Sequence, residues 1–321
     1  MRAVCAALGF SRSNFVGKQN RSLDWGDCTR SPPKTDDAQV REAIADVVME
    51  RATLQKGTLI VISYVSFMHS FKMSISLIIP ALNEQFVVGT VLADIYRETA
   101  KVFETFEIIA IDDGSTDETG RVMDEFAAAN PEIIVIHNNP NLGLGASFKL
   151  GLACAKYKYV MLLCGDGGLP ASSLPAIYKE VGTADLVIPY MVNLRRIKTP
   201  ARYALSRTYS NLLNLLFGFR LRYYNGLPVY QRSLLQAITI TSEGFGFQGE
   251  ILVKLLKSGC TYVQVGVDGA EETGNSSALR LKNIFSVGKT FVHLIFEIIR
   301  FKPVPREIIE SGREKPRHYG C

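Results

Sequence analysis

Two adjacent carboxylates are the residues of this chain whose types and spacing are best suited to chemistry. Asp112 and Asp113 directly follow an apolar run, residues 106–111, and directly precede Gly114 and Ser115. Glycine permits a tight turn and serine can cap the next helix, but neither explains why two acids that repel each other stand together. Carboxylates accept hydrogen bonds from the N–H and hydroxyl groups of a ligand. We therefore expect a polar ligand at this point of the fold.

Three further groups of polar or small residues lie next to predicted elements in a similar way. The segment 80–84, which reads Pro-Ala-Leu-Asn-Glu, follows the first apolar run of a regular pattern, and Asp166 follows a later one. Gly143 and Gly145 precede a predicted helix. Each group also has a plain structural interpretation, because asparagine often caps a helix and glycines often serve packing. Their shared position at the ends of elements is stronger evidence than any one of them.

The elements that must position these residues alternate between short apolar runs and helical periodicity. Strands are predicted at 74–80, 106–111, 133–137 and 157–163, and helices at 87–102, 116–129 and 145–155. This alternation is typical of βαβ units, which form a mostly parallel sheet with helices on both faces. Ligands of such sheets bind at the carboxyl ends of the strands. We expect further elements at 202–217 (helix), 221–230 (strand or hairpin), 249–258 (helix) and 261–267 (strand).

The charge of the chain is distributed unevenly. Its 321 residues are 47% apolar and carry a net charge of +5, which suits a sizeable core and does not call for a nucleic-acid partner. No acid lies between Asp185 and Glu243, whereas eight cations do: Arg195, Arg196, Lys198, Arg202, Arg207, Arg220, Arg222 and Arg232. Such a stretch fits phosphate-bearing substrates or an anionic membrane surface. A solvated basic helix face is the alternative.

The six cysteines show no disulfide or metal-ligand spacing, so we expect reduced thiols and a cytosolic setting. Cys154 and Cys260 stand among apolar neighbours, and we expect both in the core.

Three segments are expected along the chain: an extension at 1–72, a domain at 73–280, and a C-terminal segment at 281–321. The extension is a targeting or interfacial segment, a disordered tail, or upstream sequence included by the choice of start codon. We favour the last, with Met68 or Met73 as natural starts. Residues 281–301 predict an amphipathic helix that lies at a membrane interface or docks on the domain. The basic tail from Lys302 is expected to be loose.

The segments 80–84 and 112–115, in this order and spacing, resemble the family 2 glycosyltransferases of the GT-A fold. Within that family the chain resembles the dolichol-phosphate mannosyltransferase branch, over residues 74–280. The resemblance implies an α/β fold with a Rossmann-like, mostly parallel sheet flanked by helices. It also implies a GDP- or UDP-sugar donor. The residues that match the family's nucleotide-sugar-binding positions are Pro80, Ala81, Asn83, Glu84, Asp112, Asp113, Gly143, Gly145 and Ser206.

The same resemblance predicts a metal at the end of the fourth strand. The family carries an Asp-x-Asp motif there, and this chain has Cys164 at the first position and Asp166 at the second. Mg²⁺ is often held by one or two carboxylates together with substrate phosphates and water. Asp166 with Mg²⁺ or Mn²⁺ is therefore the expected metal site. A thiolate suits these metals poorly, so Cys164 is expected to serve packing.

The resemblance also implies which residues form the part of the site that binds the acceptor. Arg202 and Ser206 match an Arg-x-x-x-Ser pattern that contacts phosphates, and their spacing places them on one helix face. Glu250 lies in a Phe-Gln-x-Glu segment, where an acid can act as catalytic base. Near residues 273–276 the family carries Arg or His, whereas this chain has Glu271 and Glu272. We list Asp166, Arg202 and Glu250 as the expected catalytic residues.

These patterns predict an inverting sugar transfer to a polyprenyl phosphate by an enzyme peripheral to the cytoplasmic face of a membrane. A saccharide or other hydroxyl acceptor is one alternative, and it would need Glu250 as a base. A degenerate, non-catalytic nucleotide-sugar binder is another, motivated by Cys164, Glu271 and Glu272. A sugar-nucleotide pyrophosphorylase would need a glycine-rich basic loop after the first strand, where this chain has residues 80–84.

Overall fold

The computed structural model describes residues 73–242, 246–270, 294–298 and 300–313. The chain divides between residues 64 and 65, and every described residue lies in the C-terminal part. The predicted extension at 1–72 and the departure from the family at 271–276 lie outside the described residues, so both stay predictions.

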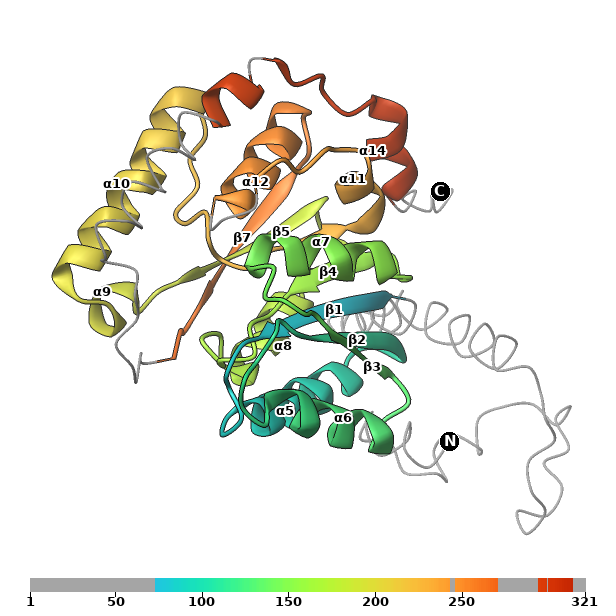
Figure 1. Ribbon diagram of the computed structural model, residues 1–321. Coiled ribbons are helices and arrows are strands. Elements are labelled where there is room, and N and C mark those ends of the chain that lie inside the picture. The colour runs from blue at the N-terminus through green and yellow to red at the C-terminus, as the bar shows by residue number, and fades with distance from the viewer. Residues whose placement is uncertain (1–72, 243–245, 271–293, 299, 314–321) are drawn as a thin grey trace, which may run out of the picture. The chain divides into compact units, whose positions relative to one another are not determined.

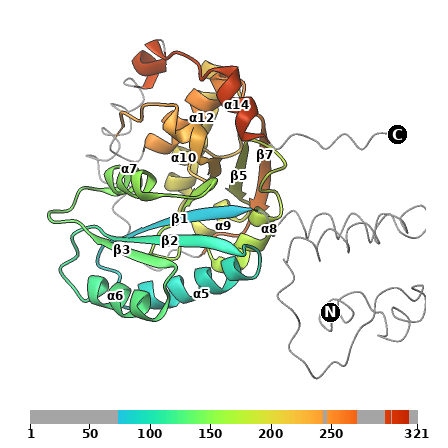
Figure 2. The ribbon, with the colours of Figure 1, turned by 90° about the vertical axis from the view of Figure 1, so that its right-hand side faces the viewer.

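Four parallel strands form one half of the sheet, in the order β3-β2-β1-β4. They are β1 (Ser74–Ala81), β2 (Thr105–Asp112), β3 (Ile133–His137) and β4 (Tyr159–Leu162). The helices between them are α5 (Val88–Ala100), α6 (Thr119–Ala129) and α7 (Leu144–Cys154). Helices α5 and α6 cover one face and α7 the other (Figures 1 and 2). Burial on both faces explains why β1 and β2 are continuous apolar runs rather than alternating ones.

The other half of the sheet contains the only antiparallel strand in the described part of the chain. Strand β6 (Val229–Gln231) runs antiparallel to β4 and to β5 (Leu186–Met191), and β7 (Tyr262–Val267) lies parallel to β5 at the edge. The short elements of this half are η1 (Ala171–Ser173), α8 (Leu174–Tyr178), α9 (Leu194–Ile197) and α11 (Arg232–Gln236). Its longer helices are α10 (Pro200–Phe217) and α12 (Phe247–Lys257). The predicted mostly parallel α/β fold is confirmed.

The described residues of the C-terminal segment, 294–298 and 300–313, contribute side chains to the core of the domain. Residues 294–298 are helical, and α14 (Arg306–Gly312) follows. The side chains of Leu294, Ile298, Val304 and Ile309 are buried in the core cluster. Docking is therefore the alternative that fits residues 294–298, and the prediction of a loose tail from Lys302 is wrong as far as residue 313.

Two smaller findings bear on the predictions. Cys260 is buried as expected, but Cys154, the last residue of α7, is exposed, so the expectation of a core position for Cys154 is wrong. Among the described residues, no helix combines the length and the apolar character that crossing a membrane requires.

Candidate functional site

The carboxyl ends of β1, β2 and β4 are joined by backbone hydrogen bonds. The amide of Asp113 donates to the carbonyl of Ala81 at 2.9 Å, and the amide of Gly165 donates to the carbonyl of Pro80 at 3.0 Å. A Cβ on Gly165 would lie 2.5 Å from the Cβ of Ala81, so only glycine permits this approach. Pro80 and Ala81 thus bring the loops after β2 and β4 to one edge.

Asn83 connects the loop after β1 to the loop after β2. Its φ of 57° is left-handed, which asparagine tolerates better than most residues. The Oδ1 of Asn83 accepts a hydrogen bond from the amide of Thr116 at 2.8 Å, and the amide of Asn83 donates to the Oγ of Ser115 at 3.0 Å. The amide of Glu84 donates to the Oγ1 of Thr119 at 2.7 Å. These bonds fix the two loops relative to each other.

Asp112 is 8% exposed, and each of its carboxylate oxygens has one partner. Oδ1 accepts a hydrogen bond from the amide of Ser115 at 3.0 Å, and Oδ2 lies 3.1 Å from the Nδ1 of His137. Burial by itself would raise the pKa of Asp112, but the hydrogen bonds from Ser115 and His137 lower the pKa below its ordinary value. The carboxylate is therefore ionised at neutral pH, and each oxygen has a second lone pair that could accept a hydrogen bond.

Asp113 uses its carboxylate to hold a neighbouring loop. Its Oδ1 accepts hydrogen bonds from Asn138 Nδ2 (2.8 Å), the Leu142 amide (3.0 Å) and Ser147 Oγ (2.9 Å). Its Oδ2 accepts one from the Gly143 amide at 2.8 Å. Burial to 5% exposure completes this environment. The two adjacent acids thus have different environments, because Asp112 has one protein partner on each oxygen and Asp113 has four partners in all.

The two predicted glycines lie at the start of α7. Gly143 precedes the helix with a φ of 86°, and its amide is the one that binds Asp113. Gly145 lies buried in the first turn of the helix. The backbone here is held against the acids at the end of β2, where the resemblance places the donor.

Glu84 and Asp166 are two acids from different strand ends that lie close enough to interact. Burial raises the pKa of Glu84, and the negative charges of Asp166 and Asp117 raise it further. Asp166 is exposed, and its Oδ1 accepts a hydrogen bond from the Gly168 amide at 2.9 Å. Burial, followed by the charges of Asp166 and Glu84, raises the pKa of the Cys164 thiol to about 12. The thiol therefore stays protonated and packs against the core, as expected of it.

The loop of Asp166 is linked to the basic segment through residues 268–270. The amide of Ala270 donates to the carbonyl of Gly168 at 3.2 Å. The side chain of Asn193 binds both backbone groups of Gly269, at 2.8 and 2.9 Å. Helix α9, with Arg195 and Arg196, begins at the next residue. Asn193 is therefore held beside the loop of Asp166. Arg195 and Arg196, the first cations of the basic segment, come shortly after Asn193 in the sequence.

Arg202 and Ser206 lie half-buried on α10, one turn apart on the same face. Tyr209 continues this face, and a Cβ on Gly249 of α12 would lie 2.5 Å from its hydroxyl. Helices α10 and α12 lie beside each other on the β5–β7 half of the sheet (Figure 1). Helix α10 thus contacts the start of the segment that contains Glu250 through Tyr209, which lies one turn beyond Ser206.

Glu250 is enclosed rather than presented to a substrate. It is 1% exposed, and its oxygens accept hydrogen bonds from the Thr241 amide (2.9 Å), the Ser242 amide (2.8 Å) and Lys254 Nζ (2.5 Å). Burial would raise its pKa, but the hydrogen bonds from Lys254 and Ser242 lower the pKa below its ordinary value. A general base must come within hydrogen-bond reach of the proton that it removes. The enclosed environment fits an anchor of the 239–242 turn, and the catalytic role expected of Glu250 stays a prediction.

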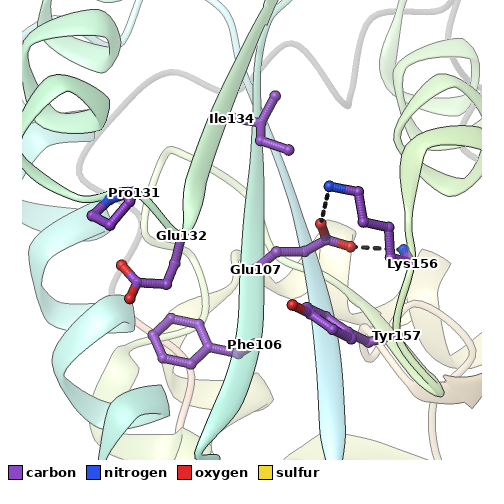
Figure 3. A pocket seen from close by; sticks show the side chains of 7 residues that line it. All are labelled: Phe106, Glu107, Pro131, Glu132, Ile134, Lys156 and Tyr157. Atoms are coloured by element: carbon purple, nitrogen blue, oxygen red, sulfur yellow. Dashed lines mark hydrogen bonds and ion pairs between the residues drawn. The ribbon is translucent and has the colours of Figure 1, made fainter.

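A shallow pocket lies at the other end of the same strands (Figure 3). Glu107 is its buried acid, but this carboxylate accepts hydrogen bonds from Ser76 Oγ and from the amide of Lys156, each at 2.7 Å. The Nζ of Lys156 lies 3.6 Å from the same carboxylate. These bonds close β2 against the turn before β4, which is a structural role.

Sequence reasoning missed His137, which ends β3 beside Asp112. Its signal was available, because His137 is the polar residue at the end of a predicted strand, like the groups that were selected. It also missed Asn138 and Ser147, which bind Asp113. Those two partners lie 25 and 34 residues from Asp113 in the sequence, so no local pattern indicates them.

Comparison with known proteins agrees with this geometry. Residues 76–242, more than half of the chain, match Glycosyl transferase family 2. Polyprenol monophosphomannose synthase from Mycolicibacterium smegmatis is 27% identical over 219 residues, 64% of this chain and 81% of the relative. Undecaprenyl-phosphate mannosyltransferase from Micrococcus luteus is 30% identical over 182 residues, 53% of this chain and 74% of the relative.

Two solved structures share the fold. Glucosyl-3-phosphoglycerate synthase from Mycobacterium tuberculosis, in complex with UDP, superposes with a TM-score of 0.54 at 18% identity, over 70% of this chain and 80% of that one. Mannosyl-3-phosphoglycerate synthase from Rubrobacter xylanophilus has a TM-score of 0.54 at 17% identity, over 78% of each chain.

A mostly parallel sheet with polar side chains gathered at its carboxyl edge, together with the family match, defines a glycosyltransferase. The chain belongs to glycosyl transferase family 2. Within that family its named relatives support the predicted resemblance to enzymes that use polyprenyl phosphates.

Proposed function

We propose that this enzyme transfers a sugar, with inversion, from a GDP- or UDP-sugar to a polyprenyl phosphate at a membrane surface. The observation that carries the proposal is that the carboxyl ends of β1, β2 and β4 are joined by backbone hydrogen bonds and each has an acid at or just after its end: Glu84, Asp112 and Asp166, of which Glu84 and Asp166 interact. Two of these acids repel each other, which fits a site completed by a cation and a diphosphate. The names of the relatives support the lipid acceptor.

The nucleoside half of the donor is held by the loops after β1 and β2. Asp112 is the carboxylate with lone pairs open to a base N–H or a ribose hydroxyl. Asn83 positions the loop of Asp112, together with Pro80 and Ala81. Asp113 acts indirectly, because it fixes Gly143 and so the backbone before Gly145 against which the nucleotide lies.

The diphosphate half fits a hard divalent cation, Mg²⁺ or Mn²⁺. Asp166 is an exposed carboxylate beside a second acid, Glu84, and the protonated Cys164 is no ligand. One carboxylate suffices when substrate phosphates and water complete the coordination. The bound cation would supply positive charge that stabilises the departing nucleoside diphosphate. A fold relative from Mycobacterium tuberculosis was solved with Mn²⁺ and UDP, which is compatible with this assignment.

The acceptor half needs cations rather than a base. A lipid phosphate is anionic at neutral pH, so its oxygen can attack the anomeric carbon without losing a proton. This agrees with the enclosed Glu250. Arg202 and Ser206 on α10 would hold the phosphate, and the cations of α9 would add electrostatic attraction.

The membrane part of the proposal rests on α10. Leu212, Leu215 and Leu216 lie on one face near its end and are 39%, 80% and 46% exposed. Exposed leucines near Arg207 and Arg220 suit an anionic lipid surface.

A donor assay tests the first half of the proposal. Purified protein is given radiolabelled GDP- and UDP-sugars together with a polyprenyl phosphate, with and without Mg²⁺ or Mn²⁺, and release of nucleoside diphosphate is measured. We expect release that requires the cation and falls about a hundredfold or more in Asp166→Asn, which keeps the shape but loses the charge. Asp94→Asn, on the exposed surface of α5, is the control. Binding of donor without any turnover would favour the degenerate binder, and full activity of Asp166→Asn would remove the metal assignment.

A further inference from the structure

His137 lies between two carboxylates that come from different elements. Its Nδ1 lies 3.1 Å from Asp112 Oδ2, and its Nε2 lies 3.0 Å from Asp124 Oδ1 on α6. A neutral imidazole has a single N–H and can donate to only one of the two acids. An imidazolium donates to both at once. The arrangement therefore favours the charged ring.

Among the described contacts, no positively charged side chain competes with His137 for Asp112 and Asp124. Asp112 faces it from β2 and Asp124 faces it from α6, whereas Arg121 on α6 pairs with Glu118 and Glu125. Gly120 keeps the space beside the ring open, because a Cβ there would lie 2.6 Å from Asp112 Oδ2 and 3.1 Å from the ring. The hydrogen bond to Asp112 raises the pKa of His137, desolvation opposes that rise, and Asp124 adds to it.

We infer that His137 is a positioning residue of the donor site, and that its charged ring holds Asp112 in the orientation that binds the nucleoside. This inference rests on the proposed function of Asp112. Oδ1 of Asp112 is fixed by the Ser115 amide, so the contact of Oδ2 with His137 sets the rotation of the carboxylate.

The sign of the pH dependence follows from these contacts. The pKa of Asp112 is lowered, so Asp112 stays ionised from weakly acidic to basic pH. The pKa of His137 is raised above its ordinary value of 6.5. The paired arrangement is complete below pH 6.5 and is lost as the pH rises through the raised pKa of His137. Nucleotide affinity should therefore fall with rising pH.

The test measures UDP and GDP binding by calorimetry with Mg²⁺ present, at about pH 6, below the ordinary pKa of histidine, and at about pH 8.5. We expect the wild-type affinity for the nucleotide that binds to fall roughly threefold to tenfold between these values, as expected for weakening one charge-assisted hydrogen bond. His137→Gln keeps one hydrogen-bond donor but cannot titrate, so its affinity should vary less with pH. The phosphates of the nucleotide titrate in the same way in both experiments. Only the difference in pH dependence between the wild type and His137→Gln therefore reports on His137.

A second variant, Asp124→Asn, removes the far carboxylate without touching Asp112. It should move the midpoint of the pH profile to lower pH, which a merely structural histidine would not do. Thermal unfolding at both pH values checks that each variant is folded.

Three results would overturn the inference. Equal pH dependence in the wild type and His137→Gln would do so, as would an unmoved midpoint in Asp124→Asn. Both leave the proposed function intact. If neither nucleotide bound the wild type at the lower pH, the proposed function would fail and the inference with it.

Discussion

At the scale of single residues, Asp112 and Asp113 are neighbours in the sequence, yet their carboxylates have different hydrogen-bond partners. Asp112 has one protein partner on each oxygen, and Asp113 has four across its two oxygens. Adjacent residues at the end of a strand point to opposite sides, which separates a ligand-facing acid from a structural one. The repulsion expected of the pair is offset by donors from the loop 138–147.

Asp113→Ala should lower the free energy of unfolding by about 2–4 kcal/mol, because it leaves four buried or half-buried donors without their acceptor. Urea denaturation measures the change. Asp94→Ala, which removes an exposed acid paired only with Arg97 on its own helix, should change stability by less than about 0.5 kcal/mol. Equal effects in the two variants would show that Asp113 does not anchor the loop.

The role of Glu250 can be separated from catalysis through its buried partner, Lys254, which is 2% exposed. Lys254→Met leaves the carboxylate of Glu250 buried without its cation and should cost about 3–5 kcal/mol, whereas Glu250→Gln should cost less, because Glu297 lies 3.6 Å from Lys254 Nζ. The double variant should cost less than the sum of the two.

If Glu250 is only an anchor, the folded double variant should keep its sugar transfer within about threefold, whereas loss of a general base would reduce transfer by about a hundredfold or more. The measurement is the initial rate of transfer, compared at a temperature where both proteins are folded by circular dichroism.

At the scale of elements, α14 is fastened to the sheet by one ion pair. Arg313 Nε and Nη2 donate to the two oxygens of Asp185 at 2.9 and 2.6 Å, and the amide of Thr261 donates to the same carboxylate at 2.7 Å. Asp185 is 2% exposed. Because 128 residues separate the two partners, this pair closes the C-terminal segment onto β5.

Arg313→Met should lower stability at neutral pH by roughly 2–4 kcal/mol, since it leaves a buried carboxylate with fewer donors. Burial would raise the pKa of Asp185, but Arg313 and Thr261 lower the pKa below its ordinary value of 3.8. Its contribution is therefore present above that value and is lost as the pH falls through the lower pKa of the folded state.

Urea denaturation from neutral pH into the acid range below about pH 4 checks both points. The gap between the wild type and Arg313→Met should narrow as the pH falls. Arg306→Met, at the exposed start of the same helix, should show no gap. A gap that does not depend on pH would mean that the charge of Asp185 is not the cause.

The proposed contact with a membrane can be tested on helix α10. Leu215→Ser/Leu216→Ser should weaken binding to vesicles that contain phosphatidylglycerol by about tenfold or more, because two leucines lose their apolar contact with lipid. Nucleotide binding should not change. Val192→Ser, which removes another exposed apolar side chain at 59% exposure, is the control. Unchanged vesicle binding of the α10 variant would place the membrane contact elsewhere.

At the scale of the whole molecule, the two halves of the domain differ in how far the sequence predicts them. The half from β1 to β4 could be predicted, and the other half could be predicted only in part. The predicted strand at 133–137 agrees with β3, and the others lie within a few residues of β1, β2 and β4. Local apolar periodicity suffices there because each strand is buried on both faces.

Strand β5 was missed because Pro189 interrupts a short apolar run. The proline is tolerated because β6 pairs only with Leu186 and Val187, so no hydrogen bond to β6 is lost at Pro189. The enclosure of Glu250 and the pairing of Asp185 with Arg313 could not be predicted either. Both depend on packing between distant segments, which a single sequence does not display.

The central claim concerns the product, and one measurement tests it most directly. The purified enzyme is incubated with Mg²⁺, the radiolabelled nucleotide sugar that it turns over, and a polyprenyl phosphate, and the label is partitioned between water and organic solvent. We predict that label enters the solvent phase only when the lipid phosphate is present, and that Asp166→Asn abolishes the transfer. Label that stays in the aqueous phase, while nucleoside diphosphate is released in the presence of the lipid, would contradict the account.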